Sequence, residues 1–155
     1  MLKAPFGTGW QVSTDSIAGG TSRVSLSVAG AAPDGNAALV MSGEVTADFI
    51  APWAGVGFSP GAQPFTPADI SAANALRFWV RGEGKSFALM GFSPAGGQRP
   101  AVAPIAVTGD WKEVTMPFAS LRNFDPHNAM LLLVAADRPG AFKLEIANVR
   151  LIHAE

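Results

Sequence analysis

Short runs in which apolar and polar residues alternate recur along the whole chain, and glycine or proline clusters separate them. In one such run Leu76, Phe78 and Val80 share one face, while the intervening residues share the other. Because successive side chains of a strand point to opposite faces, this alternation indicates half-buried β-strands. The pattern predicts ten strands, at residues 10–13, 22–28, 37–49, 55–58, 75–81, 86–92, 101–107, 112–117, 129–135 and 142–152.

Four local features refine this prediction. Residues 81–85, Arg-Gly-Glu-Gly-Lys, are typical of a tight hairpin turn between two strands. Residues 129–136 are apolar on both faces, which predicts a central strand that is covered on both sides. The alternation in the last strand changes phase near Ala147 and Asn148, which predicts a β-bulge. Pro67 favours a single helical turn over residues 67–71, because proline suits the first position of a helix.

Together these elements predict an all-β fold, an antiparallel β-sandwich formed by residues 1–155 as a single domain. The 155 residues suffice for one hydrophobic core, and no segment keeps a helical repeat. Most of the 17 glycines and 12 prolines form turn-like clusters that separate the predicted strands, as is typical of all-β domains.

The charge balance excludes several functions. A net charge of −1 without a basic stripe gives no electrostatic attraction for nucleic acid, and no lysine or arginine run is present to dock on a membrane. The longest apolar run is too short to span a bilayer. The absence of cysteine removes thiolate chemistry and disulfides. Only 15% of residues are charged, so either a partner covers part of the surface or uncharged polar residues form it.

No residue pattern in this sequence forms a recognisable catalytic site. Residues 57–61 match the Gly-x-Ser-x-Gly motif of serine hydrolases, but Pro60 has no backbone N–H to donate to an oxyanion. Neither His127 nor His153 has a metal-ligand partner at useful spacing. Most carboxylates fall in turns, where solvation explains them. We therefore expect a protein that is not an enzyme.

The predicted strand at residues 75–81 places Arg77, Trp79 and Arg81 on one face. If the hairpin pairs it with the next strand, Phe92 joins that face. A flat aromatic ring flanked by guanidinium groups can bind a sugar, by stacking on its CH groups and donating to its hydroxyls. The alternative is packing, with the arginine stems lying over the tryptophan. Trp53, in a proline-flanked loop, is a further candidate for ligand contact or for covering the core.

Calcium is the one cofactor that the sequence leaves open. Sandwiches of this kind hold structural Ca²⁺ with scattered carboxylates and loop carbonyls, which leave little linear signature. Asp15, Asp48 and Glu145 are the candidate ligands.

Four segments resemble the complex I intermediate-associated protein 30 family, in the family's order. Residues 10–22 are similar to its Asp-x-x-Met-Gly-Gly-x-Ser opening, with Ala18 in place of methionine. The other three are Phe-Trp-Val-Arg-Gly-Glu-Gly-Lys at 78–85, Trp-Lys-Glu-Val-Thr-Met-Pro-Phe at 111–118, and residues 142–151.

The resemblance implies a galactose-binding-like jelly roll related to family 11 carbohydrate-binding modules. It carries over no catalytic residues, and the chain lacks the tyrosine that is common in sugar platforms. Mitochondrial members act as assembly chaperones, whereas bacterial domains of this kind resemble C-terminal appendages of larger proteins, including exported amidohydrolases. We therefore expect a non-catalytic carbohydrate-binding accessory module; the sequence leaves its compartment open, with a periplasmic or secreted location favoured. The alternative is a protein-interaction or assembly domain without a sugar ligand.

Overall fold

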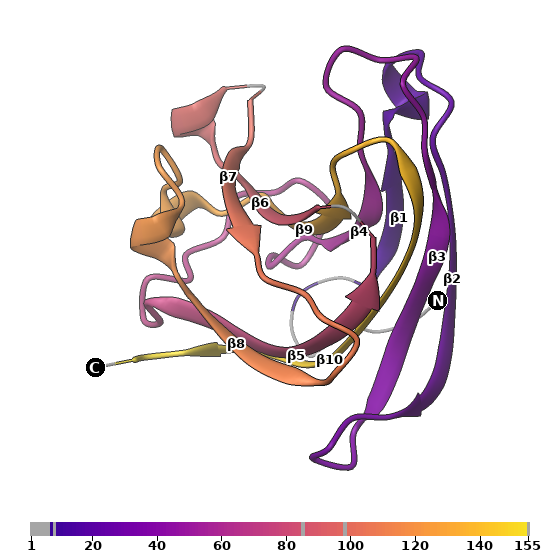
Figure 1. The fold of residues 1–155 in the computed structure, drawn as a ribbon. Coiled ribbons are helices and arrows are strands. Elements are labelled where there is room, and N and C mark those ends of the chain that lie inside the picture. Colours follow the sequence, from indigo (N-terminus) through magenta and orange to yellow (C-terminus); the bar gives the residue numbers. More distant parts are fainter. Residues whose placement is uncertain (1–6, 8, 85, 98, 155) are drawn as a thin grey trace.

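The computed structural model describes residues 7, 9–84, 86–97 and 99–154, and these form two antiparallel five-stranded sheets that pack face to face (Figure 1). The first sheet has the strand order β1-β4-β9-β6-β7, and the second has the order β2-β3-β10-β5-β8. The strands are β1 Gln11–Thr14, β2 Arg23–Ala31, β3 Ala37–Val45, β4 Ala54–Phe58, β5 Ala75–Glu83, β6 Phe87–Phe92, β7 Ala101–Ile105, β8 Lys112–Pro117, β9 Leu131–Ala136 and β10 Gly140–Ile152. Each corresponds to a strand that the alternation predicts, so the all-β sandwich is confirmed.

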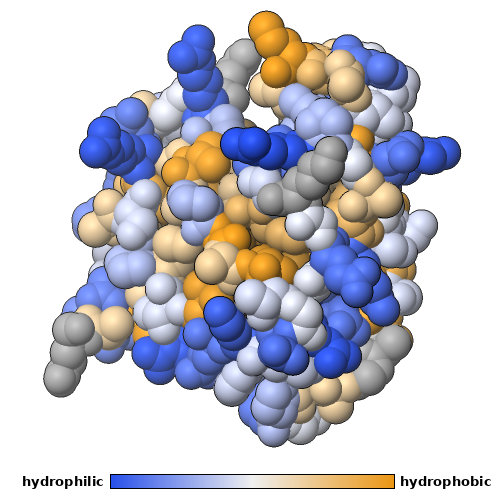
Figure 2. Space-filling model, in the orientation of Figure 1, coloured by the Kyte–Doolittle hydropathy of each residue, from blue (hydrophilic) through white to orange (hydrophobic). Residues whose placement is uncertain are grey.

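The core between the sheets is built from the apolar members of each alternating strand. On β5, Leu76, Phe78 and Val80 are buried, and on the facing sheet Leu89 and Val134 are buried as well. Figure 2 shows apolar surface in the middle of the face seen in Figure 1, where one end of the core lies between the sheets. Hydrophilic residues surround it.

The predicted hairpin at residues 81–85 is wrong. β5 pairs with β10 and β8 in the second sheet, whereas β6 pairs with β9 and β7 in the first sheet. The segment between β5 and β6 therefore crosses from one sheet to the other, and Lys85 itself lies outside the described residues. Glycine-rich turns suit both kinds of connection, because the local sequence does not specify which strand pairs with which.

The helical turn predicted at residues 67–71 is also wrong. Ala68 instead forms an isolated antiparallel bridge with Ala129, and the Asp69 side chain accepts a hydrogen bond from the Ser71 backbone N–H at 2.9 Å. Proline is compatible with both conformations, and pairing with a distant residue decides between them.

Two finer predictions are confirmed. The register of β10 against β5 shifts between Ala147 and Arg150, with Asn148 at a positive φ of 50°, so the β-bulge is present. The apolar segment around residues 131–136 is the central strand of the first sheet, β9, between β4 and β6.

Among the described residues, four short 3-10 helices connect the strands: η1 Asp15–Ala18, η2 Pro94–Gly96, η3 Phe118–Ser120 and η4 Pro126–Asn128. In Figure 1, η1 with the β3–β4 loop and η2 with the β6–β7 connection rise on opposite sides of β6, β9 and β4. No helix in the described part of the chain is both long and apolar enough to cross a membrane.

Candidate functional site

A groove of about 660 Å³ lies on the outer face of the first sheet. Its floor comes from outward-facing apolar side chains on three adjacent strands, since Met90 on β6 pairs with both Leu133 on β9 and Val102 on β7. Phe92 and Leu131 form the next cross-strand pair along the same strands. The floor is therefore a continuous apolar surface, which is unusual for the solvent side of a sandwich strand.

Loops supply the walls of the groove. Trp53 and its neighbour Pro52 come from the β3–β4 loop, Ile17 comes from η1, and Phe65 comes from the segment after β4. Trp53 packs against the buried outer-face cluster that includes Met90 and contacts the Phe49 ring edge to face, with 6.0 Å between the centroids. The indole Nε1 of Trp53 donates to Ser13 Oγ at 3.1 Å, which fixes the ring against β1.

Asp15 fixes the loop that carries Trp53. Its side chain is completely buried, and its carboxylate accepts hydrogen bonds from Ser22 N at 3.0 Å, Ser22 Oγ at 2.7 Å and Trp53 N at 3.2 Å. The Asp15 backbone N–H donates in return to the Trp53 carbonyl at 3.1 Å. A buried carboxylate with three donors satisfies the rule that buried charges are hydrogen-bonded. η1, β2 and the β3–β4 loop are thereby joined.

The same network explains the glycine pair of the family-like opening. Gly19 caps η1 in the left-handed region at φ 101°, which glycine adopts without steric cost. A Cβ at Gly20 would lie 2.4 Å from the Asp15 carboxylate, so only glycine permits the close approach. The motif residues Asp15, Gly19, Gly20 and Ser22 thus build the groove wall that holds Trp53.

The groove contains little charge. Asp137 is the only ionisable side chain among its described lining residues. The Asp137 Oδ1 atom is buried and has no hydrogen-bond partner in the part of the chain that the structure describes. The Asp137 carboxylate and the Ser13 hydroxyl are the polar side-chain groups of the described lining that can accept a hydrogen bond from a ligand hydroxyl.

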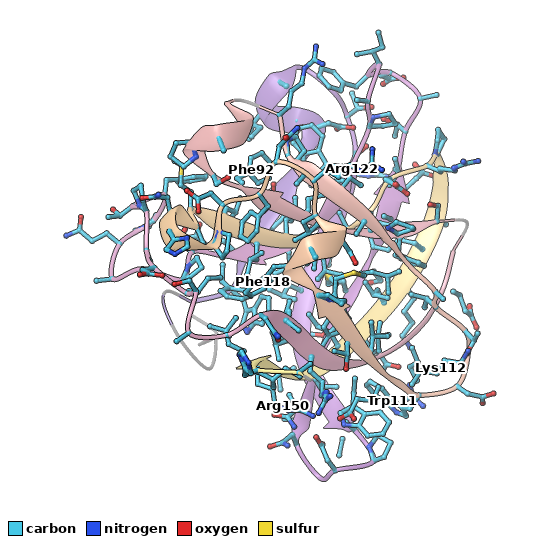
Figure 3. The ribbon with its side chains drawn as sticks, turned by 90° about the vertical axis from the view of Figure 1, so that its left-hand side faces the viewer. Phe92, Trp111, Lys112, Phe118, Arg122 and Arg150 are labelled. Atoms are coloured by element: carbon cyan, nitrogen blue, oxygen red, sulfur yellow. The ribbon has the colours of Figure 1, made fainter. Side chains whose placement is uncertain are left out.

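The structure divides the five predicted ligand residues between two faces. Trp53 and Phe92 both line the groove. Arg77, Trp79 and Arg81 lie on the outer face of the second sheet, because β5 belongs to that sheet. Figure 3 shows the separation, with Phe92 in the upper part of the molecule and Trp111 and Arg150 in the lower part.

On the second sheet these side chains contact other residues of the same sheet and its loops, although the Arg81 side chain is 40% exposed and lines a shallow pocket of about 190 Å³ with Glu83 and Lys143. Trp79 and Trp111 pack against a small buried alanine cluster. The Arg81 guanidinium lies 4.7 Å from the centre of the Trp111 ring and forms an ion pair with Glu145. Arg77 Nε donates to Thr115 Oγ1 at 2.8 Å. The arginine over a tryptophan is Arg81 over Trp111 and not over Trp79, and both ligand binding and packing by the three residues stay predictions.

The three carboxylates suggested for calcium are not brought together. Asp15 is bonded to Ser22 and Trp53, Asp48 accepts from the Thr21 hydroxyl, and Glu145 pairs with Arg81. Among the described residues, no group of three or more acidic, histidine or cysteine side chains is placed to hold a metal ion. Calcium binding stays a prediction without a geometric site.

Sequence reasoning did not anticipate most of the groove. Leu131, Leu133 and Val102 line it, as do Phe65 and Asp137. One signal was present: the strand from residue 131 is apolar on both faces, and its outer face proved to be the groove floor. A second signal was the proline-flanked Phe65, which repeats the context of Trp53.

Comparison with known proteins identifies the family. Residues 3–126 match the sequence profile of the Complex I intermediate-associated protein 30 (CIA30) family, and the chain belongs to this family. A search of curated protein sequences finds no match.

Several solved structures with the same fold are carbohydrate-binding modules. The family 11 module of the cellulosomal cellulase Lic26A-Cel5E of Clostridium thermocellum has a TM-score of 0.73 and 19% identity, covering 98% of this chain and 91% of that one. A second structure of a family 11 module from this organism, in complex with a β-1,3-1,4-mixed-linked tetrasaccharide, has a TM-score of 0.71 and 19% identity over 94% and 89% of the chains.

The family 30 module of the C. thermocellum cellulase Cel9D-Cel44B has a TM-score of 0.65 and 18% identity, with 84% and 83% covered. The fold is thus the galactose-binding-like sandwich of these modules, and the chain is carbohydrate-binding-like in architecture.

Proposed function

We propose that this chain is a non-catalytic carbohydrate-binding module that holds a glycan in the groove of the first sheet. The observation that carries the proposal is the apolar, aromatic-edged groove across the outer face of the first sheet. Its volume lies within the roughly 300–1,000 Å³ that is usual for ligand sites.

The groove chemistry suits a sugar chain. The CH faces of pyranose rings can stack on Trp53 and Phe92 and lie on the Leu131–Leu133 floor, while hydroxyls donate to Asp137. Because no cationic side chain is among the described lining residues, an uncharged glycan is favoured over an acidic one.

An accessory role follows from the same proposal. Two of the fold relatives are modules of cellulosomal cellulases, and this chain offers a binding surface without an identified catalytic constellation. We expect it to function beside an exported hydrolase, amidohydrolase-like as the family resemblance suggests, and to keep that enzyme near its glycan.

Affinity gel electrophoresis with soluble polysaccharides, followed by calorimetry with mixed-linkage β-glucan tetrasaccharide and mannohexaose, tests the proposal. Trp53→Ala should reduce affinity by about tenfold or more, because it removes a stacking surface. Trp79→Ala, the same change on the opposite face, is the matched control and should leave affinity unchanged. Absence of retention of the wild type on every glycan would contradict the proposal, and loss in Trp79→Ala alone would move the site to the second sheet.

A second candidate, protein docking, is favoured by the exposed apolar side chains beside the groove. Ile17 in its wall is 83% exposed, and Ile50, two residues before Pro52, is 97% exposed. Large exposed aliphatic groups of this kind mark interaction sites when they gather. Selection from a displayed peptide library should then enrich apolar peptides whose binding is lost in Ile17→Glu, with Val28→Glu on the second sheet as control.

A further inference from the structure

Phe65 stands out because its backbone and its side chain are both unfavourably placed for folding. Three described residues other than glycine have a positive φ: Phe65 at 60°, Asn123 at 65° and Asn148 at 50°. Asparagine tolerates the left-handed region, whereas a bulky aromatic residue there is an outlier. The Phe65 ring does not gain full burial in exchange, since the residue is 56% exposed.

The surrounding contacts hold this conformation in place. The Phe65 backbone N–H donates to the Oγ of Ser59, a residue that is only 3% exposed, at 2.9 Å. Thr66 N donates to the Gln63 carbonyl at 3.3 Å and closes a turn around the aromatic residue. Farther along, Ala68 exchanges two backbone hydrogen bonds with Ala129, of 2.9 and 2.8 Å. The segment is therefore fastened on both sides of Phe65.

The site at which the ring is presented is the groove, which Phe65 lines together with Trp53. The two aromatics come from different loops, and each loop is attached to the sandwich through a buried polar side chain, Ser59 and Asp15 respectively. Residues whose strained backbone is held in place by the surrounding structure cluster at binding and active sites. Phe65 fits this description, because burial of its ring does not compensate for the strain.

We propose that Phe65 is a ligand-contacting residue whose strained backbone is retained because it presents the ring to a glycan in the groove. This inference rests on the proposed function of the groove. It assigns a stacking position that neither the family match nor the fold comparison supplies. The Phe65 ring stacks on the ligand, as the Trp53 indole does. Binding thereby buries the part of the ring that is exposed in the free protein.

Two variants separate the ring from the strain. Phe65→Ala removes the ring and keeps the strained backbone, whereas Phe65→Gly removes the ring and relieves the strain. Both should lower affinity for the glycan that the wild type binds best in the panel above by about tenfold. Because glycine adopts a positive φ without steric cost, the melting temperature of Phe65→Gly should be about 2–4 °C higher than that of Phe65→Ala. Phe65→Tyr, which keeps the ring, should retain wild-type affinity, and Val28→Ala, an exposed residue of the second sheet, should change neither quantity.

The outcomes distinguish this inference from the proposed function. If Trp53→Ala loses the glycan while Phe65→Ala binds like the wild type, the inference is wrong and the carbohydrate site stands. Affinity that follows stability, with Phe65→Gly binding more tightly than Phe65→Ala, would also overturn it. A wild type that binds no glycan overturns the proposed function and this inference together.

Discussion

The two outer faces of the sandwich are built from the same kind of alternating strand, but they carry different side chains: ion-paired charged residues on one and apolar residues on the other. On the second sheet, Arg81 pairs with Glu145 and Arg150 pairs with Glu113 at 2.6 Å. On the first sheet, the outward-facing residues of β6, β7 and β9 are apolar, and the carboxylate beside them has an oxygen without a partner among the described residues.

The difference lies in which side chains each outer face presents to solvent: charged side chains, several of them in ion pairs, on the second sheet, and apolar side chains on the first. On the second face, Arg81 forms an ion pair with Glu145 and lies over the Trp111 ring. The groove leaves aromatic and aliphatic surface in contact with water, and covering that surface with a ligand is favourable by about 25 cal/mol per Å².

The largest effect should come from removing the carboxylate that anchors the groove wall. Asp15→Ala leaves the N–H groups of Ser22 and Trp53 without their buried acceptor, and we expect a loss of about 3 kcal/mol or more in the free energy of unfolding. Chemical denaturation measures it. Asp110→Ala, at an exposed position, should change stability by less than about 0.5 kcal/mol, and an equal loss in both variants would argue against the network.

A charge placed on the groove floor should separate binding from stability. Val102 on β7 is 49% exposed, so the Val102→Lys variant should fold normally. The lysine side chain would cover part of the groove floor and place a charge there, so glycan affinity should fall by about tenfold or more. Ser42→Lys, on the outer face of the second sheet, is the matched control. Calorimetry that finds equal affinities for the two variants would show that the floor does not contact the ligand.

A smaller effect is expected where the second face is held by charge. A double-mutant cycle on Arg81→Ala and Glu145→Ala should give a coupling of about 0.5–1 kcal/mol, because the Arg81 side chain is 40% exposed and water screens the pair. Glycan affinity should remain unchanged through the cycle. A measured change would indicate that the second face also contacts the ligand.

The smallest effect concerns Asp125, whose side chain caps the start of η4. Hydrogen bonds from the Asn128 side chain and the His127 backbone N–H lower the pKa of Asp125 below its ordinary value. Its contribution to stability is therefore complete above the ordinary carboxyl pKa and is lost as the pH falls through the lowered one. When the pH is lowered from 6 to about 3, the melting temperature of Asp125→Asn should fall slightly less than that of the wild type, because asparagine does not titrate. An identical pH profile for both proteins would contradict this.

The sequence predicted the strands well because their signal is local. Alternation of apolar and polar positions needs only neighbouring residues, and the phase change at Ala147–Asn148 located a bulge by the same logic. The family-like opening places a glycine at position 20 without giving its role. Its physical role, close approach to the Asp15 carboxylate, became visible only when η1 and β2 were placed together.

The site was predicted less well because it depends on pairing over long distances. Residues 81–85 look like a hairpin, and a hairpin would have put Trp79 and Phe92 on one surface. Instead β5 pairs with β10 and β6 pairs with β9, which separates the two aromatics onto opposite sheets.

By itself, then, the sequence determined an all-β sandwich, its ten strands and the absence of the usual catalytic patterns, since local periodicity and residue chemistry carry that information. The tertiary structure decided which apolar strand faces look outward, that Asp15 holds Trp53, and that a strained Phe65 lines the same groove. These features arise where segments distant in sequence meet, and strand alternation is the same whichever neighbour a strand selects.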